Sequence, residues 1–569
     1  MNGNRRKKYY IPIVIGLLIA LCWPINVSAC VLFYAGGDMT DDGANVFMRT
    51  EELDADSNKT YYVAPAGKHK EGEVYQGCTD FTWTFTHDSY QYEARCDGLV
   101  DGECLTCEST HEHSPYEEAG TNDHGVTVSA TQSVNANESI QKVDPFTDNG
   151  IEESEMATVL LSEASTAREG VEILTGIYDT VGAGYEGSGV MICDQNEQWY
   201  VENLSGHEYI AVLLPEDVCF MQFNVSVLGK IDLDDTEHVI ASDHLFDVAK
   251  KAGTFVGDEE ANVIDYRASF NDYLMEIDNE DWTSEWKEVV QQRLVASLNW
   301  LEDTNVWTVD NVMEDNHYVM TNVGKDSSIT GLHNDLDLKK DMSFDNVLAL
   351  FRLYPIGFAD NMNSHMYRFY PEEEQDLGTV EWFAMDNTAY NVFVPSYPML
   401  LTDTWEGYKV QLGYPDITEE KPDEGDYYYL DGEYHVHPAG WEKSYIATFS
   451  AMTNLLIYGN LDGKQFAKAQ EQLLNLQGDF ETRFVELQEE IKAEPSRQAR
   501  EEIMTNADME MAEEAHDLAL SIYQENAADA DYGEPKGFPV VPLIIGILIL
   551  AAAAIVVGVY TKKRAKKRA

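Results

Sequence analysis

A cysteine next to a candidate cleavage site is the residue of this chain best suited to nucleophilic chemistry. Cleavage between Ala29 and Cys30 would make Cys30 the first residue, with a thiol and a free α-amine. A thiol attacks well only once it is deprotonated, and an α-amine, whose ordinary pKa is about 7.7–8.0, accepts a proton near neutral pH. Cys30 would therefore carry both a nucleophile and its base.

Such a nucleophile also needs a cation beside its thiolate and donors for the oxyanion that forms on attack. The apolar run 31–34 predicts a buried strand directly after Cys30, and 46–48 predicts a second strand. Gly and Asp turn signals separate the two strands, which indicates a hairpin. Arg49 follows the second strand, so it can supply the cation beside Cys30.

The two ends of the chain predict export and a membrane anchor. Basic residues 5–8, an apolar run over 11–25 and the small residues 27–29 have the layout of a cleaved signal peptide. Val540–Tyr560 is an uncharged stretch long enough to span a bilayer, and the six Lys and Arg residues after it should stay cytoplasmic. We therefore expect a single-pass cell-membrane protein with an extracellular catalytic domain.

The sequence argues against several kinds of partner. The formal net charge of −63 repels phosphate backbones, so nucleic-acid binding is not expected. The glycine cluster 182–189 lacks the Lys-Ser or Lys-Thr that a phosphate-binding loop needs. His111–His113 and His435–His437 are short His clusters typical of exposed loops, so we expect neither a metal nor a cofactor.

The cysteines suit an oxidising compartment. Besides Cys30, six remain after signal removal, enough for up to three disulfides of unspecified pairing: Cys78, Cys96, Cys104, Cys107, Cys193 and Cys219. The first four could instead hold zinc, although their spacing matches no standard zinc pattern. Cys30 is the odd cysteine left for chemistry.

Strands come in consecutive groups with helices between the groups, which predicts an α+β fold. Alternating or apolar runs predict strands at 125–130, 189–193, 199–202, 209–214, 381–385 and 390–394. Helical spacing covers 155–178, most of 243–307, and two amphipathic helices that Glu494-Pro495 separates.

Several stretches, in order, resemble the bacterial N-terminal-nucleophile (Ntn) cysteine dipeptidases of the PepD type. Beyond the Cys30 hairpin with its Arg49-Thr50-Glu51-Glu52, these are 118–131, 167–171, 199–202, 205–207, 215–218, Asn224 and 390–397. The resemblance spans roughly residues 30 to 490.

The resemblance implies a four-layer αββα sandwich and a set of site residues. Cys30 would be the nucleophile, Arg49 would lie beside its thiol, and Asn224 would be a pocket residue that serves the oxyanion. The family usually has Asp three residues after the Arg, contacting the catalytic amine. Here that position is Glu52, one methylene longer, with Glu51 as a less favoured substitute.

These observations predict an extracellular, membrane-tethered cysteine dipeptidase that acts on dipeptides or small peptides, with a homo-oligomer possible. Its expected divisions are a signal peptide (1–29), an Ntn-hydrolase domain (30–490) with a Cys-rich insertion (68–116), a helical stalk and acidic tether (491–537), a transmembrane helix (538–560) and a basic cytoplasmic tail (561–569).

Two alternatives stay open. Related Ntn amidases cleave conjugated bile acids or penicillin V with the same Cys and Arg. The residues Val27-Ser28-Ala29-Cys30 also resemble a lipobox, in which Cys30 would be lipidated and the protein would be a non-catalytic surface-binding module. The C-terminal anchor makes a second anchor redundant, which favours the enzyme.

Overall fold

The computed structural model describes most of the chain between residues 30 and 532. The described ranges are 30–52, 59–97, 99–100, 103–104, 115–134, 136–185, 187–271, 284–308, 319–322, 327–331, 340–357, 361–412, 427–430 and 433–532. The predicted signal peptide (1–29), transmembrane helix (538–560) and basic tail (561–569) lie outside these residues. Within them, every helix is too short or too polar to cross a bilayer.

Two antiparallel sheets form the centre of the molecule. The six-stranded sheet has the order β14-β1-β2-β21-β22-β23. Its strands are β1 (Val31–Ala35), β2 (Asn45–Glu52), β14 (Cys219–Gln222), β21 (Asn361–Phe369), β22 (Thr379–Met385) and β23 (Val394–Ser396). The predicted hairpin of β1 and β2 is confirmed, with Leu32 opposite Arg49.

The eight-stranded sheet has the order β16-β13-β12-β11-β10-β9-β6-β3. Its strands are β3 (Lys59–Ala64), β6 (Tyr92–Asp97), β9 (Glu117–Asn122), β10 (Thr127–Val134), β11 (Gly187–Cys193), β12 (Gln198–Asn203), β13 (Tyr209–Leu213) and β16 (Val239–Ala241). Because β6 is an inner strand of this sheet, residues 68–116 are not simply an insertion, as the sequence had suggested.

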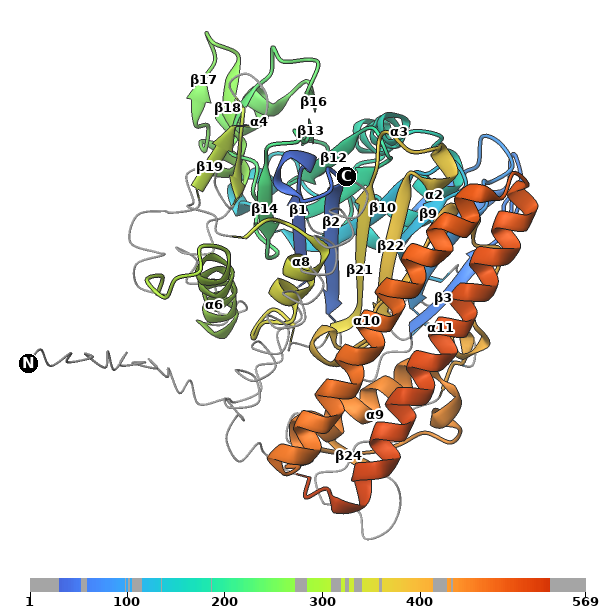
Figure 1. The fold of residues 1–569 in the computed structure, drawn as a ribbon. Coiled ribbons are helices and arrows are strands. Elements are labelled where there is room, and N and C mark those ends of the chain that lie inside the picture. The colour runs from blue at the N-terminus through green and yellow to red at the C-terminus, as the bar shows by residue number, and fades with distance from the viewer. Residues whose placement is uncertain are drawn as a thin grey trace, which may run out of the picture.

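Helices cover the outer faces of both sheets, which confirms the α+β prediction. The helices are α1 (Glu138–Gln141), α2 (Glu153–Glu163), α3 (Ala167–Thr180), α4 (Leu245–Ala252), α5 (Tyr266–Phe270), α6 (Ser284–Leu301), α8 (Phe344–Phe351), α9 (Tyr445–Tyr458), α10 (Gly463–Ala493) and α11 (Arg497–Asn526). Helices α2 and α3 cover the eight-stranded sheet, and α8 to α11 cover the six-stranded sheet (Figure 1).

Short strands form the remaining elements. Among the described residues, a small sheet has the order β15-β18-β17, and four two-stranded hairpins lie elsewhere. Their strands are β15 (Lys230–Asp232), β17 (Gly257–Asp258), β18 (Val263–Asp265), β4 (Val74–Gln76), β5 (Thr82–Thr84), β7 (Leu99–Val100), β8 (Glu103–Cys104), β19 (Val319–Asn322), β20 (Ser328–Gly331), β24 (Tyr427–Leu430) and β25 (Glu433–Val436).

Three apolar clusters separate the four layers, because alternate residues of a strand point to opposite faces. Leu32 and Tyr34 of β1 pack between the two sheets. Val31 and Phe33 pack on the other face, against the α8–α11 layer. A third cluster fills the space between the eight-stranded sheet and the helices α2 and α3. The resulting order is helix, sheet, sheet, helix.

Two helix predictions need correction. The predicted helix 155–178 is two helices, because Ala164 is extended and the Thr166 side chain caps α3 by accepting from the Glu169 backbone N–H. Of the predicted stalk and tether (491–537), the described residues 491–532 pack against the domain and do not form a stalk. Helix α11 runs beside α10 (Figure 1) and buries Met504 and Met511 in the cluster under the six-stranded sheet.

Three disulfides are excluded in this structure, because Cys96, Cys193 and Cys219 are buried free thiols. Cys193 lies in the cluster between the sheets, whereas Cys219 lies in the cluster on the far face of the six-stranded sheet. One sheet therefore separates these two sulfurs. Cys96 contacts Thr60 on the neighbouring strand. The side chains of Cys104 and Cys107 lie outside the described part of the chain.

Candidate active site

Cys30 lies immediately before β1, an inner strand of the six-stranded sheet. Strands β14 and β2 flank β1 on either side, and the Val31 backbone N–H donates to Thr50 Oγ1 at 3.1 Å. Cys30 lies two residues before Leu32, so its side chain points to the same face of the sheet, toward the eight-stranded sheet. Its side chain is buried, so the thiol lies at one end of the space between the sheets.

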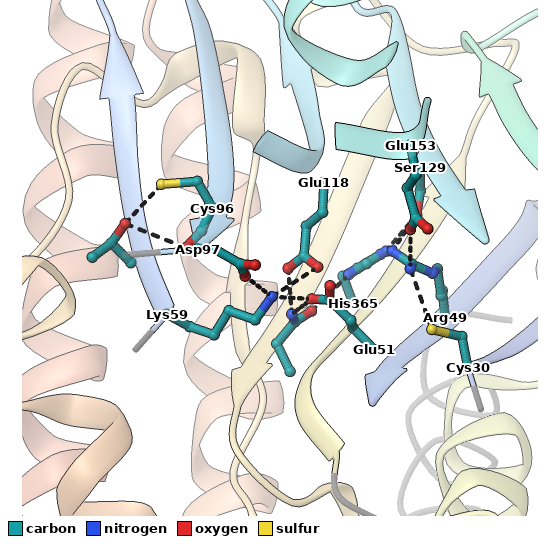
Figure 2. A network of polar contacts seen from close by, with 12 residues as sticks. Cys30, Arg49, Glu51, Lys59, Cys96, Asp97, Glu118, Ser129, Glu153 and His365 are labelled. Carbon is teal, nitrogen blue, oxygen red and sulfur yellow. Dashed lines mark hydrogen bonds and ion pairs between the residues drawn. The ribbon is translucent and has the colours of Figure 1, made fainter. Parts of the chain in front are cut away.

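Arg49 contacts the thiol, as the hairpin predicted. Its Nη2 lies 3.4 Å from Cys30 Sγ and 2.8 Å from Glu153 Oε1, and its Nη1 lies 3.4 Å from Ser129 Oγ (Figure 2). Burial alone lowers the pKa of Arg49, but Cys30 and Glu153 outweigh this effect and the pKa ends above its ordinary value. Arg49 is therefore a permanent cation beside the sulfur.

The thiol is not ionised at neutral pH while Cys30 is still joined to Ala29. Burial raises the pKa of the Cys30 thiol to about 11; Arg49 lowers it, and Glu153, Glu51 and Glu52 raise it. One cation thus faces three nearby carboxylates and a desolvated sulfur. A second positive charge would be needed to favour the thiolate.

Glu52 lies near Cys30 but is held by other partners. Arg293 Nη2, from α6, lies 2.8 Å from both carboxylate oxygens of Glu52, and Asn361 Nδ2 donates to Oε1 at 3.0 Å. Both Glu52 and Arg293 are fully buried. The carboxylate that was predicted to contact the catalytic amine is therefore fixed in place by an arginine and an amide.

Glu51 points into the space between the sheets, on the same side as Arg49. Its Oε2 accepts from Lys59 Nζ at 2.6 Å and from Asn363 Nδ2 at 2.9 Å. Lys59 also contacts Asp97 and, at 3.2 Å, Glu118. Glu51 belongs to a buried ionic cluster, and this makes it a poor substitute for Glu52.

Asn224 comes to the same end of the sheet as Cys30. It follows β14, in which Gln222 lies opposite Leu32 of β1. Because the two strands are antiparallel, two residues after Gln222 correspond to two residues before Leu32, which places Asn224 level with Cys30. Its backbone φ of +56° is left-handed, a conformation that Asn tolerates better than most residues. The turn buries the Asn224 side chain, 3% exposed, beside the start of β1.

The structure therefore places Arg49 in contact with Cys30 and brings Glu52 and Asn224 to the same end of the sheet. Sequence reasoning missed four others that touch them or extend their contacts: Ser129, Glu153, Arg293 and His365. One signal was available, because Thr127 and Ser129 place hydroxyls at alternate positions of the strand, between the apolar residues Val126, Val128 and Ala130. A polar face on a buried strand indicates that polar partners lie opposite it.

The fold and the site define a class: an α+β protein whose buried cysteine lies against an arginine at the end of an inner strand. Residues 29–284 match the model of Peptidase family C69. The chain is 30% identical over 403 residues to a probable dipeptidase B of Streptococcus pyogenes serotype M1, covering 70% of this chain and 77% of that protein. The chain belongs to peptidase family C69, and the resemblance to bacterial dipeptidases is confirmed.

Two further proteins are similar. A probable dipeptidase of Salmonella dublin is 27% identical over 390 residues, which cover 65% of this chain and 81% of that protein. The solved structure of penicillin V acylase from Agrobacterium tumefaciens aligns with 64% of this chain and 85% of its own, at 10% identity and a TM-score of 0.27.

Proposed function

We propose that this chain is a cysteine dipeptidase of the N-terminal-nucleophile kind that hydrolyses small peptides, chiefly dipeptides, through Cys30. The observation that carries the proposal is the 3.4 Å contact between Cys30 Sγ and Arg49 Nη2, at the residue that signal cleavage would make the first of the mature chain. Membership of family C69 and the dipeptidase names of the similar proteins support the substrate class.

In the proposed reaction the α-amine of Cys30 takes the thiol proton while Sγ attacks the peptide carbonyl carbon. The same amine then protonates the leaving nitrogen, the C–N bond breaks, and a thioester remains on Sγ. Water, deprotonated by the amine, attacks the thioester carbon. The C–S bond breaks, the acid leaves, and the thiol is restored with one water consumed.

The neighbouring residues would each support one of these steps. Arg49 stabilises the thiolate by its charge, and the Asn224 side-chain NH₂ donates to the oxyanion of the tetrahedral intermediate. Glu52 holds the catalytic amine, and its own position depends on the hydrogen bonds from Arg293 and Asn361. A carboxylate that two partners hold rigidly is suited to orienting a base.

Signal cleavage would be the activating step. In the uncleaved chain the Cys30 nitrogen is a peptide nitrogen without basicity, and burial raises the pKa of the thiol to about 11. Cleavage supplies an amine on the Cys30 Cα, and once this amine has taken the thiol proton its positive charge favours the thiolate. One cut thus creates the base and activates the nucleophile.

We further propose that the protein acts outside the cell, held to the membrane by residues 538–560. The basic residues 562–568 would keep the C-terminus cytoplasmic. Export would also supply the signal cleavage that the mechanism needs.

The test combines intact mass, N-terminal sequencing and turnover of the membrane-extracted protein. We expect a free Cys30 at position one, hydrolysis of a dipeptide panel, and loss of hydrolysis in Cys30→Ala. Cys219→Ala is the matched control, because it removes another buried thiol on the far face of the sheet. This control should retain turnover.

Three results would contradict the proposal. A diacylglyceryl adduct on Cys30 would support the lipidated alternative. Turnover of glycine- or taurine-conjugated bile acids or of penicillin V, with none of dipeptides, would support the amidase alternative. Full dipeptide turnover by Cys30→Ala would show that the nucleophile lies elsewhere.

A further inference from the structure

A chain of buried polar contacts crosses the space between the two sheets, from the Arg49 guanidinium to Lys59 (Figure 2). Beyond Arg49, Ser129 Oγ lies 3.0 Å from His365 Nε2, and His365 Nδ1 lies 3.1 Å from Asn363 Oδ1. Both sheets contribute, because Ser129 lies on β10 of the eight-stranded sheet and His365 on β21 of the six-stranded sheet. The direction of each hydrogen bond follows from the groups at the Lys59 end.

The two carboxylates there fix the orientation of the Asn363 amide. Asn363 Nδ2 lies 2.9 Å from Glu51 Oε2 and 2.5 Å from Glu118 Oε1. Glu51 Oε2 also accepts from the Lys59 ammonium, which can only donate. The NH₂ group of Asn363 must therefore face the carboxylates, and its Oδ1 must face His365.

The Asn363 amide in turn fixes the tautomer of His365. Oδ1 can only accept, so His365 Nδ1 must carry the proton that lies between them. Burial lowers the pKa of His365 well below its ordinary value of 6.5, and the cations Arg95, Arg49 and Lys59 lower it further. The ring is thus neutral, and its Nε2 has a free lone pair.

The tautomer then fixes the direction of the Ser129 hydroxyl. Since His365 Nε2 can only accept, Ser129 donates its O–H to it, and the lone pairs of Ser129 Oγ are left to accept from Arg49 Nη1. Every link therefore donates in one direction, from the Arg49 guanidinium toward the Glu51 and Glu118 carboxylates.

We infer that Ser129 and His365, the latter as the neutral Nδ1–H tautomer, are positioning residues that turn the Arg49 guanidinium so that Nη2 faces the Cys30 thiol. This inference deepens the proposed function and rests on it for the role of Cys30. The guanidinium has few other anchors: among the described residues Arg49 Nε makes no hydrogen bond, and Nη2 is shared between Glu153 and the sulfur.

The test measures the ionisation of the Cys30 thiol through the pH dependence of its alkylation by iodoacetamide, read at the Cys30 peptide by mass spectrometry in the mature full chain. In Ser129→Ala the guanidinium keeps only its Nη2 contacts. We expect the pH midpoint to rise by about one unit, the lower end of what a neighbouring opposite charge contributes. Thermal unfolding is recorded alongside to show that the variant is folded.

The matched control is Thr127→Val, which removes another buried hydroxyl from the same strand. Thr127 Oγ1 pairs with Thr121 Oγ1 at 2.9 Å and takes no part in the chain to Arg49. Its alkylation midpoint should equal that of the unmodified protein. An unmoved midpoint in folded Ser129→Ala, or an equal rise in Thr127→Val, would overturn the inference.

A second measurement does not depend on any variant of Ser129. In protein labelled with ¹⁵N-histidine, the signals missing from His365→Gln identify His365. We expect a protonated Nδ1 and an unprotonated Nε2 throughout pH 5 to 8. The opposite tautomer or an imidazolium would overturn the inference. Neither measurement requires turnover, so both remain interpretable if the proposed dipeptidase activity is not found.

Discussion

Nη2 of Arg293 lies 2.8 Å from both carboxylate oxygens of Glu52, and neither side chain is exposed to solvent. The two residues come from different layers, since Glu52 ends β2 and Arg293 lies on α6. This contact therefore ties the α6 helix to the end of the strand that carries Arg49.

Removing Arg293 should destabilise the protein strongly. Arg293→Ala leaves the Glu52 carboxylate buried without its cation, and breaking a buried ion pair in this way costs about 3–5 kcal/mol. Chemical denaturation should show a loss of that size in the free energy of unfolding. Lys70→Ala is the control, because its pair with Asp88 is exposed and should contribute little. A comparable effect of both variants would contradict the importance of the buried pair.

The local part of the site could be predicted from the sequence, and the long-range part could not. Cys30 and Arg49 belong to one hairpin, so a strand pattern and two turn signals were enough to bring them together. Arg293 gave no comparable signal. It is one basic residue in a helical stretch, and its contact with Glu52 depends on how α6 packs against the six-stranded sheet.

The difference between local and long-range contacts also explains the errors in the predicted fold. Residues 68–116 looked like an insertion because Cys, Gly and charge dominate there, yet β6 within them pairs with β3 and β9. Cysteine count and an expected oxidising compartment suggested disulfides, but pairing depends on which face of a sheet each sulfur occupies. Cys193 and Cys219 illustrate this, since a whole sheet lies between them.

Arg49 should not be replaceable by lysine. Its Nη1 contacts Ser129 while its Nη2 contacts both Glu153 and Cys30, and a single ammonium cannot span these positions. We expect kcat/KM of Arg49→Lys for a dipeptide to fall by about 10²–10³-fold, the size of losing one preorganised electrostatic contact. Steady-state kinetics on the purified protein measure this.

The matched control is Arg168→Lys. Arg168 is partly exposed on α3, where it lies over the Trp199 ring and contacts Glu197 at 3.2 Å. It is therefore an arginine outside the candidate site, and its replacement should leave kcat/KM unchanged. Unimpaired turnover in Arg49→Lys would remove Arg49 from the proposed mechanism.

Cleavage before Cys30 should change the reactivity of the thiol. In a form that retains Ala29, the pKa of the Cys30 thiol is about 11, so alkylation at pH 7.5 should be very slow. In the form that begins at Cys30, the new α-amine, which becomes positively charged when it takes the thiol proton, should lower the alkylation midpoint by about 1–3 pH units. Equal midpoints in the two forms would show that cleavage does not activate the thiol.

Asp508 on α11 should make the protein less stable as the pH rises from about 4 to 7. Burial raises the pKa of Asp508 from 3.8 to about 7; Glu93 raises it further and Arg95 lowers it. Among the described residues, Asp508 Oδ2 has no hydrogen-bond partner. In this pH range the folded protein keeps a proton that the unfolded chain has lost, so raising the pH favours unfolding.

Asp508→Asn tests this prediction because it removes the ionisation while keeping the size of the side chain. A pKa difference of about three units corresponds to about 4 kcal/mol. At pH 8 the variant should therefore be more stable than the unmodified protein by up to about that amount, whereas at pH 4 the two should agree. Denaturation at both pH values measures the difference. A variant that is destabilised at pH 8 would instead show that the ionised carboxylate, facing Arg95, stabilises the contact between α11 and the sheets.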